Sequence, residues 1–175
     1  MNAKTLFLGA FCTICLVSGP IKADEPKPNP LDTVPDAMPF NTPYGTPISL
    51  DKATETLNAA AAEAKKHGWA LNIAVVDSGA NLVAFNRMDG AMLASIQIAE
   101  HKARTAAKFR RETKAFETAI QVGGNPYVTT LDDMIGSRGG IPLIADGKLI
   151  GAIGCSGGTG SQDEVACKAG AAAIK

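Results

Sequence analysis

The hydrophobic pattern changes its period along the chain, and each period predicts an element. Small apolar side chains recur every three or four residues over 49–67, which predicts a helix closed by a glycine. Apolar and polar residues then alternate over 71–75, and a second strand-like run follows over 82–88. Residues 77–81, Asp-Ser-Gly-Ala-Asn, are typical of a turn. This part of the chain therefore predicts a helix followed by a β-hairpin.

The middle of the chain returns to a helical period. Over 91–109 the apolar residues again share one direction, and Met92 is expected to point into that buried stripe. A short helix is predicted over about 114–122 and ends where two glycines precede a proline. Residues 127–137 show no clear period.

A second hairpin and a last helix complete the predicted elements. The apolar runs 141–145 and 148–155 are joined by Asp-Gly, which suits a two-residue type I′ turn. Ser161 followed three residues later by Glu164 is typical of a capping box and predicts a terminal helix. Hairpins separated by helices favour an α+β fold, an antiparallel sheet with helical cover.

The N-terminal part carries an export pattern. Lys4, an apolar run over 6–17 and a small residue at Ala23 are typical of a secretory signal peptide, so cleavage after Ala23 is predicted. An uncleaved anchor is the alternative, but a membrane span needs about 20 apolar residues. The seven prolines of 24–47 predict an extended leader ahead of a folded domain over 48–175. The protein is accordingly expected to be periplasmic or secreted, with no membrane span once the signal is removed.

The charge composition bears on which kinds of molecule the protein can bind. The chain has 17 basic and 17 acidic side chains, which argues against a nucleic-acid binder.

Phe40 and Tyr44 of the leader are expected to dock on the domain or on a neighbouring subunit. Cys155 and Cys167 remain after signal removal, and the predicted strand and helix could bring them level, so a disulfide is predicted. Two free buried thiols are the alternative.

One lysine of the second long helix stands apart from the other cations. Lys102 lies near the margin of the apolar stripe, beside Ser95 and near Thr105, whereas Arg104 projects away from it. A lysine in that position can snorkel, pair with a carboxylate or hold an anionic ligand.

His101 is the best intrinsic candidate for an iron ligand. Imidazole suits iron, and an exposed position can reach a groove between subunits. The alternative is an exposed histidine with no ligand. His67, the only other histidine, lies far from it in sequence, so no metal site of two neighbouring histidines is predicted.

The glycine-rich loop before the terminal helix is a third candidate. Its first members are Ser156, Gly157 and Gly158, and Asp163 follows at the start of the helix. The loop lacks the Gly-Lys-Ser/Thr ending of a nucleotide P-loop. It is either part of a ligand pocket, which Gly139 and Gly140 would also face, or a tight strand-to-helix turn.

Three segments resemble the GlcG/HbpS-like haem-binding family. They are Ser-Ile-Gln-Ile-Ala-Glu-His-Lys-Ala-Arg-Thr-Ala over 95–106, Gly-Gly-Ile-Pro-Leu over 139–143, and the run over 151–163; the leader 39–45 is also similar to that of exported members. The resemblance implies a profilin-like antiparallel sheet of about five strands with helices on both faces. It also implies a homo-oligomer of even number, and some members bind haem or corrinoid-related tetrapyrroles. Cys155 stands where an aliphatic residue is more usual in this family.

The leading hypothesis is therefore an exported binding protein for haem or a related anionic tetrapyrrole. Lys102 and the basic helix segment would bind the propionates, and His101 or an oxygen ligand would bind the iron. One alternative is a small-molecule enzyme of lyase or isomerase type, in which Lys102, Asp163 and the glycine loop form a polar pocket. The other is an oligomeric accessory protein without a ligand.

Overall fold

The computed structural model describes residues 33–174. The chain divides into two compact units, residues 1–37 and 38–175, and the described residues 33–37 of the first form no helix or strand. The predicted signal peptide and the first residues of the leader lie outside the described residues. No helix among the described residues is long and apolar enough to cross a membrane.

The elements of the second unit follow the predicted order. In sequence they are α1 (Leu50–Lys66), β1 (Asn72–Asp77), β2 (Leu82–Arg87), α2 (Ser95–Phe109), α3 (Lys114–Gln121), the 3-10 helix η2 (Pro126–Thr130), β3 (Gly140–Ala145), β4 (Lys148–Ser156) and α4 (Gly160–Ala171). Both residues of the second hairpin turn have positive φ, 49° at Asp146 and 70° at Gly147, as a type I′ turn requires.

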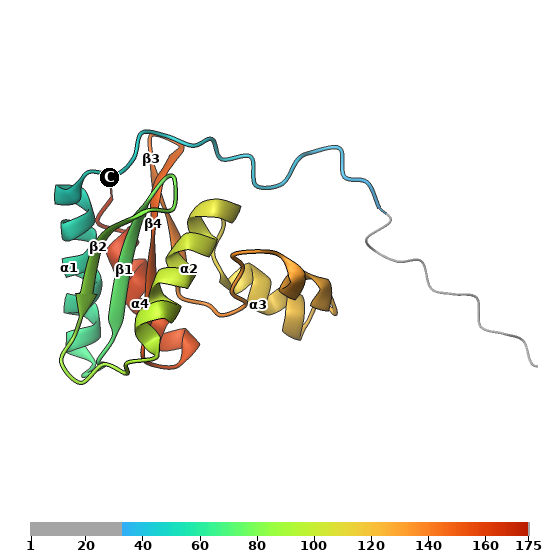
Figure 1. Ribbon diagram of the computed structural model, residues 1–175. Helices are drawn as coiled ribbons and strands as arrows, with labels where there is room; N and C mark the ends of the chain where they lie inside the picture. The colour runs from blue at the N-terminus through green and yellow to red at the C-terminus, as the bar shows by residue number, and fades with distance from the viewer. Residues whose placement is uncertain (1–32, 175) are drawn as a thin grey trace, which may run out of the picture. The chain divides into compact units, whose positions relative to one another are not determined.

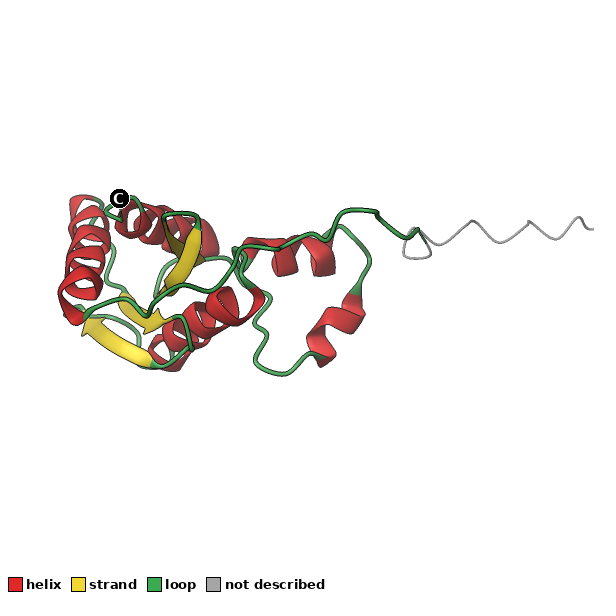
Figure 2. Cartoon of the chain, turned by 90° about the horizontal axis from the view of Figure 1, so that it is seen from above, coloured by secondary structure: helices red, strands yellow, loops and turns green. Residues whose placement is uncertain are grey.

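The strands form one antiparallel sheet in the order β2-β1-β4-β3. Helices α1 and α4 pack on one face and α2 on the other, while α3 and η2 lie to one side of these layers (Figure 1, Figure 2). The fold is thus α+β with helices on both faces, as predicted. The expected number of about five strands is corrected to four among the described residues.

A short stretch of the leader pairs with the start of β4, in line with β1. The Gly45 amide donates to the Leu149 carbonyl at 2.7 Å, and the Leu149 amide donates to the Pro43 carbonyl at 2.8 Å. The pairing is possible because β1 ends at Asp77, opposite Gly151, and leaves this end of β4 unpaired on that side. Prolines have no N–H to donate, so the pairing stays a single bridge.

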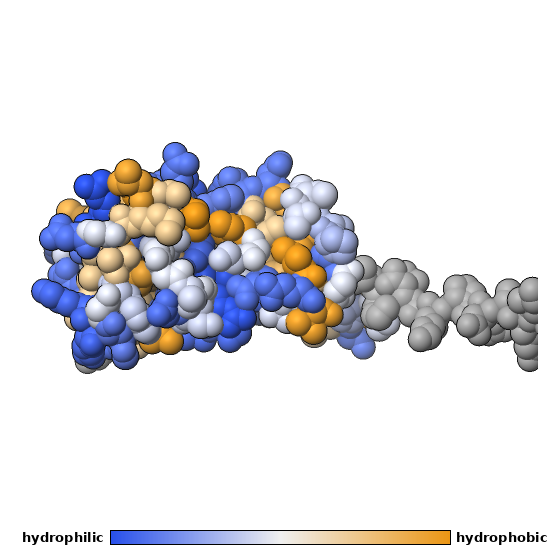
Figure 3. All heavy atoms as spheres, turned by 90° about the horizontal axis from the view of Figure 1, so that it is seen from below, coloured by the Kyte–Doolittle hydropathy of each residue, from blue (hydrophilic) through white to orange (hydrophobic). Residues whose placement is uncertain are grey.

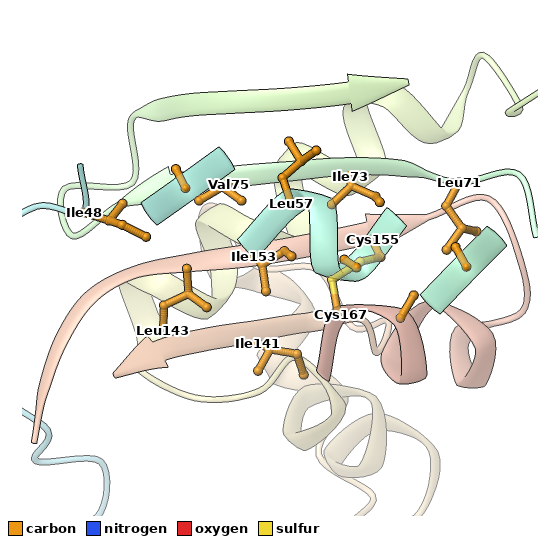
Figure 4. Close-up of a cluster of buried hydrophobic side chains, with 14 of the residues drawn as sticks. Ile48, Leu57, Leu71, Ile73, Val75, Ile141, Leu143, Ile153, Cys155 and Cys167 are labelled. Carbon is orange, nitrogen blue, oxygen red and sulfur yellow. A yellow bond between two sulfur atoms is a disulfide. The ribbon is translucent and has the colours of Figure 1, made fainter. Parts of the chain in front are cut away.

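The core is split by the sheet into two clusters. The cluster under α1 and α4 holds the larger side chains, among them Leu57, Ile73 and Ile153 (Figure 4). The cluster under α2 is built mainly of alanines, so that helix approaches the sheet closely. A Cβ on Gly154 would overlap the backbone of α2 at Ala99, which explains the glycine at that position.

Two helix starts differ from the prediction. Helix α2 begins at Ser95 because the preceding residues form turns, in which the Ser95 amide donates to the Met92 carbonyl. Met92 is therefore 59% exposed, and its predicted place in the buried stripe is wrong. Helix α4 is capped by Thr159 and Gln162, two residues before the predicted capping box.

The end of the leader docks on the domain, which is one of the two predicted alternatives. The Tyr44 hydroxyl donates to the Lys108 carbonyl at 2.9 Å, and the Arg110 guanidinium donates to the Thr42 carbonyl at 3.1 Å. The Arg111 guanidinium lies 3.3 Å from the centre of the Phe40 ring. Tyr44 thereby satisfies a carbonyl at the C-terminal end of α2, which has no partner within the helix.

Candidate functional site

Lys102 and Asp163 form a buried ion pair between α2 and α4. The Lys102 Nζ donates to Asp163 Oδ2 at 2.8 Å and to the Cys155 carbonyl at 3.1 Å. Only 1% of the Lys102 side chain and 3% of the Asp163 side chain are exposed. Asp163 Oδ1 accepts the Gly158 amide at 3.0 Å. The pair therefore connects α2, the end of β4 and the start of α4.

Two glycines close over this pair. Gly139 has φ +113°, and a Cβ there would lie 2.8 Å from the Asp163 Cβ and 3.2 Å from the Lys102 Nζ. Gly140 lies against the backbone of Lys102, and its amide donates to the Thr113 Oγ1 at 2.9 Å. These glycines leave room for the lysine. We name Lys102, Asp163, Gly139, Gly140 and Gly158 the buried cluster.

The structure brings these predicted residues together, and their predicted role in ligand binding stays a prediction. Two groups that contact the buried cluster were not predicted from the sequence: the Thr113 hydroxyl and the Cys155 carbonyl. Thr113 precedes a predicted helix, a position where threonine is usually an N-cap, so nothing in the sequence pointed to a bond with a distant glycine. A backbone carbonyl carries no sequence signal at all.

The structure joins Cys155 and Cys167 by a disulfide next to the buried cluster, with a Cα–Cα distance of 5.7 Å. Both residues are buried, and Figure 4 shows the bond between β4 and α4. The pairing follows because α4 turns back along the sheet after the glycine loop. Together with the ion pair, the disulfide attaches α4 to the sheet.

The outer face of α2 carries a shallow hollow. Its volume is about 360 Å³, and it is lined by Gln97, Glu100, His101, Arg104 and Asp133. The Arg104 guanidinium is 2.9 Å from the Glu100 carboxylate. We name this surface the His101 hollow.

Residues behind the His101 hollow hold its wall in place. The Thr105 hydroxyl donates to the Asp133 carbonyl at 2.7 Å and accepts from the Ile135 amide at 3.1 Å. Asp133 also pairs with Lys108, and the hydrogen bond from Lys108 lowers the pKa of the Asp133 carboxyl. Thr105 is fully buried behind this wall, and its predicted contact with a ligand stays a prediction.

The remaining predicted residues lie at the end of the sheet where α2 begins. Ser95 and Ser156 are buried, and Ser156 is paired with Asn72 across β1 and β4. The Asn72 side chain donates to the Met92 carbonyl at 2.8 Å, whereas its carbonyl oxygen has no protein partner. Gly157 has φ +143° and lies against the Ala70 carbonyl, which favours its interpretation as part of a tight turn.

A charged network lies beside the buried cluster. The Arg138 guanidinium donates to the Glu117 carboxylate at 2.7 Å, and this hydrogen bond lowers the pKa of Glu117. Glu164, on α4, accepts from Lys168 at 2.7 Å and from Lys114 at 3.2 Å. Burial alone would raise the pKa of Glu164, but these partners lower it.

The described residues show no group of three or more His, Cys, Asp or Glu side chains placed to hold a metal ion.

The fold, the buried cluster and the His101 hollow together define a class of small α+β domains. In this class an alanine-rich helix packs closely on one face of an antiparallel sheet and carries a histidine on its outer side. The chain belongs to the HbpS-like family, described as "Haem degrading protein HbpS-like", whose profile matches residues 48–172. Protein GlcG of Escherichia coli strain K12 is 41% identical over 109 residues, covering 62% of this chain and 81% of GlcG.

Solved structures of relatives share the fold. A double mutant of HbpS from Streptomyces reticuli has a TM-score of 0.70 and 30% identity, covering 82% of this chain and 98% of that one. The haem complex of PduOC has a TM-score of 0.67 and 27% identity, covering 74% of this chain and 96% of that one.

Proposed function

We propose that this protein binds haem or a related anionic tetrapyrrole and that the His101 hollow holds the iron side of the ligand. The observation that carries the proposal is the position of His101, whose imidazole lines an open hollow beside a guanidinium on the outer face of α2. Membership of the HbpS-like family and the haem complex of the related PduOC domain support it.

The residues of the hollow fit one part of a haem. The His101 imidazole suits an iron ligand, and Arg104 supplies a cation of the kind that binds a propionate. The volume of about 360 Å³ is at the small end for ligand pockets, and the lining is polar. The hollow would thus cover part of one face of the ring next to a propionate, and the rest of the ring would contact another surface. Bound haem would supply the iron, and His101 would be the ligand that this protein offers to it.

The second surface is proposed to come from another copy of this chain in a homo-oligomer of even number. β2 is an edge strand, with Leu82 45% exposed and Phe85 only partly buried, so it leaves apolar side chains uncovered. Sedimentation of the mature protein with and without haemin tests this part. A single monomeric species under both conditions would contradict it.

The direct haem role of Lys102 stays a prediction. Since only 1% of the Lys102 side chain is exposed, a contact with a propionate would require its pair with Asp163 to open. Arg104 borders the hollow instead, so the structure favours Arg104 over Lys102 as the propionate partner.

An absorbance titration of the mature protein with haemin tests the proposal, with a Soret band that saturates at a fixed stoichiometry as the expected result. His101→Ala is expected to shift or abolish the band. His67→Ala is the matched control, because His67 is the other histidine of the chain and its side chain bonds Glu63 on α1. Wild-type spectra for both variants would refute ligation by His101, and no band for the unchanged protein would refute haem binding.

We also propose that the protein works in the periplasm or outside the cell after removal of residues 1–23. The support is the charged start, the apolar run and the small residue Ala23. Mass spectrometry of exported protein is expected to show an N-terminus at Asp24. An intact Met1 on exported protein would contradict the proposal.

A further inference from the structure

A second hollow lies where α1 and β2 end, on the opposite face of the sheet from α2. Its volume is about 680 Å³, nearly twice that of the His101 hollow and well inside the range of small-molecule pockets. Helix α1 forms one wall, and the chain segments entering β1 and leaving β2 form the others. Figure 3 shows this end of the molecule, where hydrophobic residues lie among hydrophilic ones. We name it the α1–β2 hollow.

The floor of the α1–β2 hollow is apolar and firmly held. Trp69, the only tryptophan of the chain, lines it together with Met88, and both pack against the core cluster under α1. The Trp69 amide donates to the Ala64 carbonyl at 3.0 Å, and the His67 ring stacks on the indole at 4.4 Å. Ala62 on α1 also lines the hollow. A flat apolar ligand would therefore contact a preformed surface.

The rim of the α1–β2 hollow is positive. Lys65 and Arg87 both line it, and neither has an ion-pair partner among residues 33–174. Asp89 is the one carboxylate in the lining, which leaves an excess of one positive charge. Glu63, two residues before Lys65 on α1, already binds Lys66 at 2.7 Å and His67 at 3.2 Å. The two unpaired cations are thus available to an anionic group.

We propose that the α1–β2 hollow binds a small aromatic carboxylate, a ligand class distinct from the haem proposed for α2. The aromatic ring would lie on Trp69 and Met88, where ring–ring and sulfur–ring contacts add to the burial of apolar area. The carboxylate would lie between Lys65 and Arg87, and the guanidinium can bind both of its oxygens. Charge and shape together select the anion, since neither a neutral ring nor a simple anion makes both sets of contacts.

Calorimetric titration of the mature protein with 2-naphthoate tests the proposal, and 2-naphthamide is the neutral control of the same shape. We expect one naphthoate per chain and binding of the amide weaker by about fivefold or more. Lys65→Gln and Arg87→Gln should each weaken naphthoate binding by about fivefold. Lys66→Gln removes the same charge from the neighbouring residue, outside the hollow, and should leave the affinity unchanged.

The position of the ligand is read from the single indole N–H signal in the ¹H–¹⁵N spectrum, which belongs to Trp69. This signal should move with naphthoate but not with buffer alone. No binding, equal affinity for the amide, or equal losses in Lys65→Gln and Lys66→Gln would overturn the proposal. An unmoved Trp69 signal would also overturn the proposal, because it is the result expected if a second copy of this chain closes the hollow. His101→Ala is expected to keep naphthoate binding. Failure of the haem proposal can therefore be told apart from failure of the naphthoate proposal. Loss of naphthoate binding on haemin loading would instead overturn the assignment of two separate sites.

Discussion

Replacing Lys102 by Met is expected to destabilise the fold strongly. Methionine keeps most of the side-chain length but removes the charge that Asp163 faces at 2.8 Å, together with the hydrogen bond to the Cys155 carbonyl at 3.1 Å. Asp163 would keep only its bond from the Gly158 amide in a place where 3% of its side chain is exposed. Removing one partner of a buried ion pair typically costs about 3–5 kcal/mol.

The free energy of unfolding from urea titrations of the mature protein measures this cost, and the melting temperature should fall by about 6–20 °C, at about 2–4 °C per kcal/mol. Lys102→Met combined with Asp163→Asn should cost less than the sum of the two single changes, because the double variant leaves no unpaired charge. Arg104→Met is the surface control, since its pair with Glu100 is partly exposed and worth about 0–1 kcal/mol.

Two results would refute this reasoning. One is a loss for Lys102→Met no larger than that for Arg104→Met. The other is strict additivity of Lys102→Met and Asp163→Asn, because coupled residues in one buried bond network do not add. If Lys102→Met keeps its fold but loses the Soret band, Lys102 contacts the ligand directly and the role predicted from the sequence holds.

Three further predictions address other parts of the structure. The mature protein, unfolded without reductant, should show no free thiols, and reducing the Cys155–Cys167 disulfide should lower the free energy of unfolding by about 3 kcal/mol; two free thiols per chain would contradict the pairing. The pKa of Glu117 is lowered in the folded state by the hydrogen bond from its arginine partner, so that contribution to stability is present above a pH of about 4.3, the ordinary carboxyl value, and is lost as the pH falls. Glu117→Gln should therefore flatten the acid side of a plot of urea midpoint against pH, and an unchanged slope would contradict this. Gly139→Ala should destabilise more than Gly68→Ala in thermal melts, because both glycines have positive φ but a Cβ meets neighbours only at Gly139; equal losses would mean that backbone strain alone sets the cost.

Much of the fold could be predicted from the sequence because local signals decide it. The alternation of apolar residues, the Asp146-Gly147 turn and the glycine after α1 each act within a few residues, and they placed both hairpins and the long helices. The start of α2 was predicted too early because residues 91–94 are compatible with a helix by composition. Hydrogen bonds to preceding carbonyls hold them in turns instead.

The candidate sites also have a part that the sequence predicted and a part that only the tertiary structure decided. Helical periodicity placed Lys102 near the buried side of α2 and His101 and Arg104 on its outer side, because a helix fixes the relative direction of its own side chains. Only the tertiary structure decided that Lys102 meets Asp163, 61 positions away, and that Gly139 leaves the space for the pair. The α1–β2 hollow likewise joins Lys65 to Arg87 through the packing of a helix on a strand. Such meetings depend on how elements pack across the sheet, and no local period of the sequence encodes that packing.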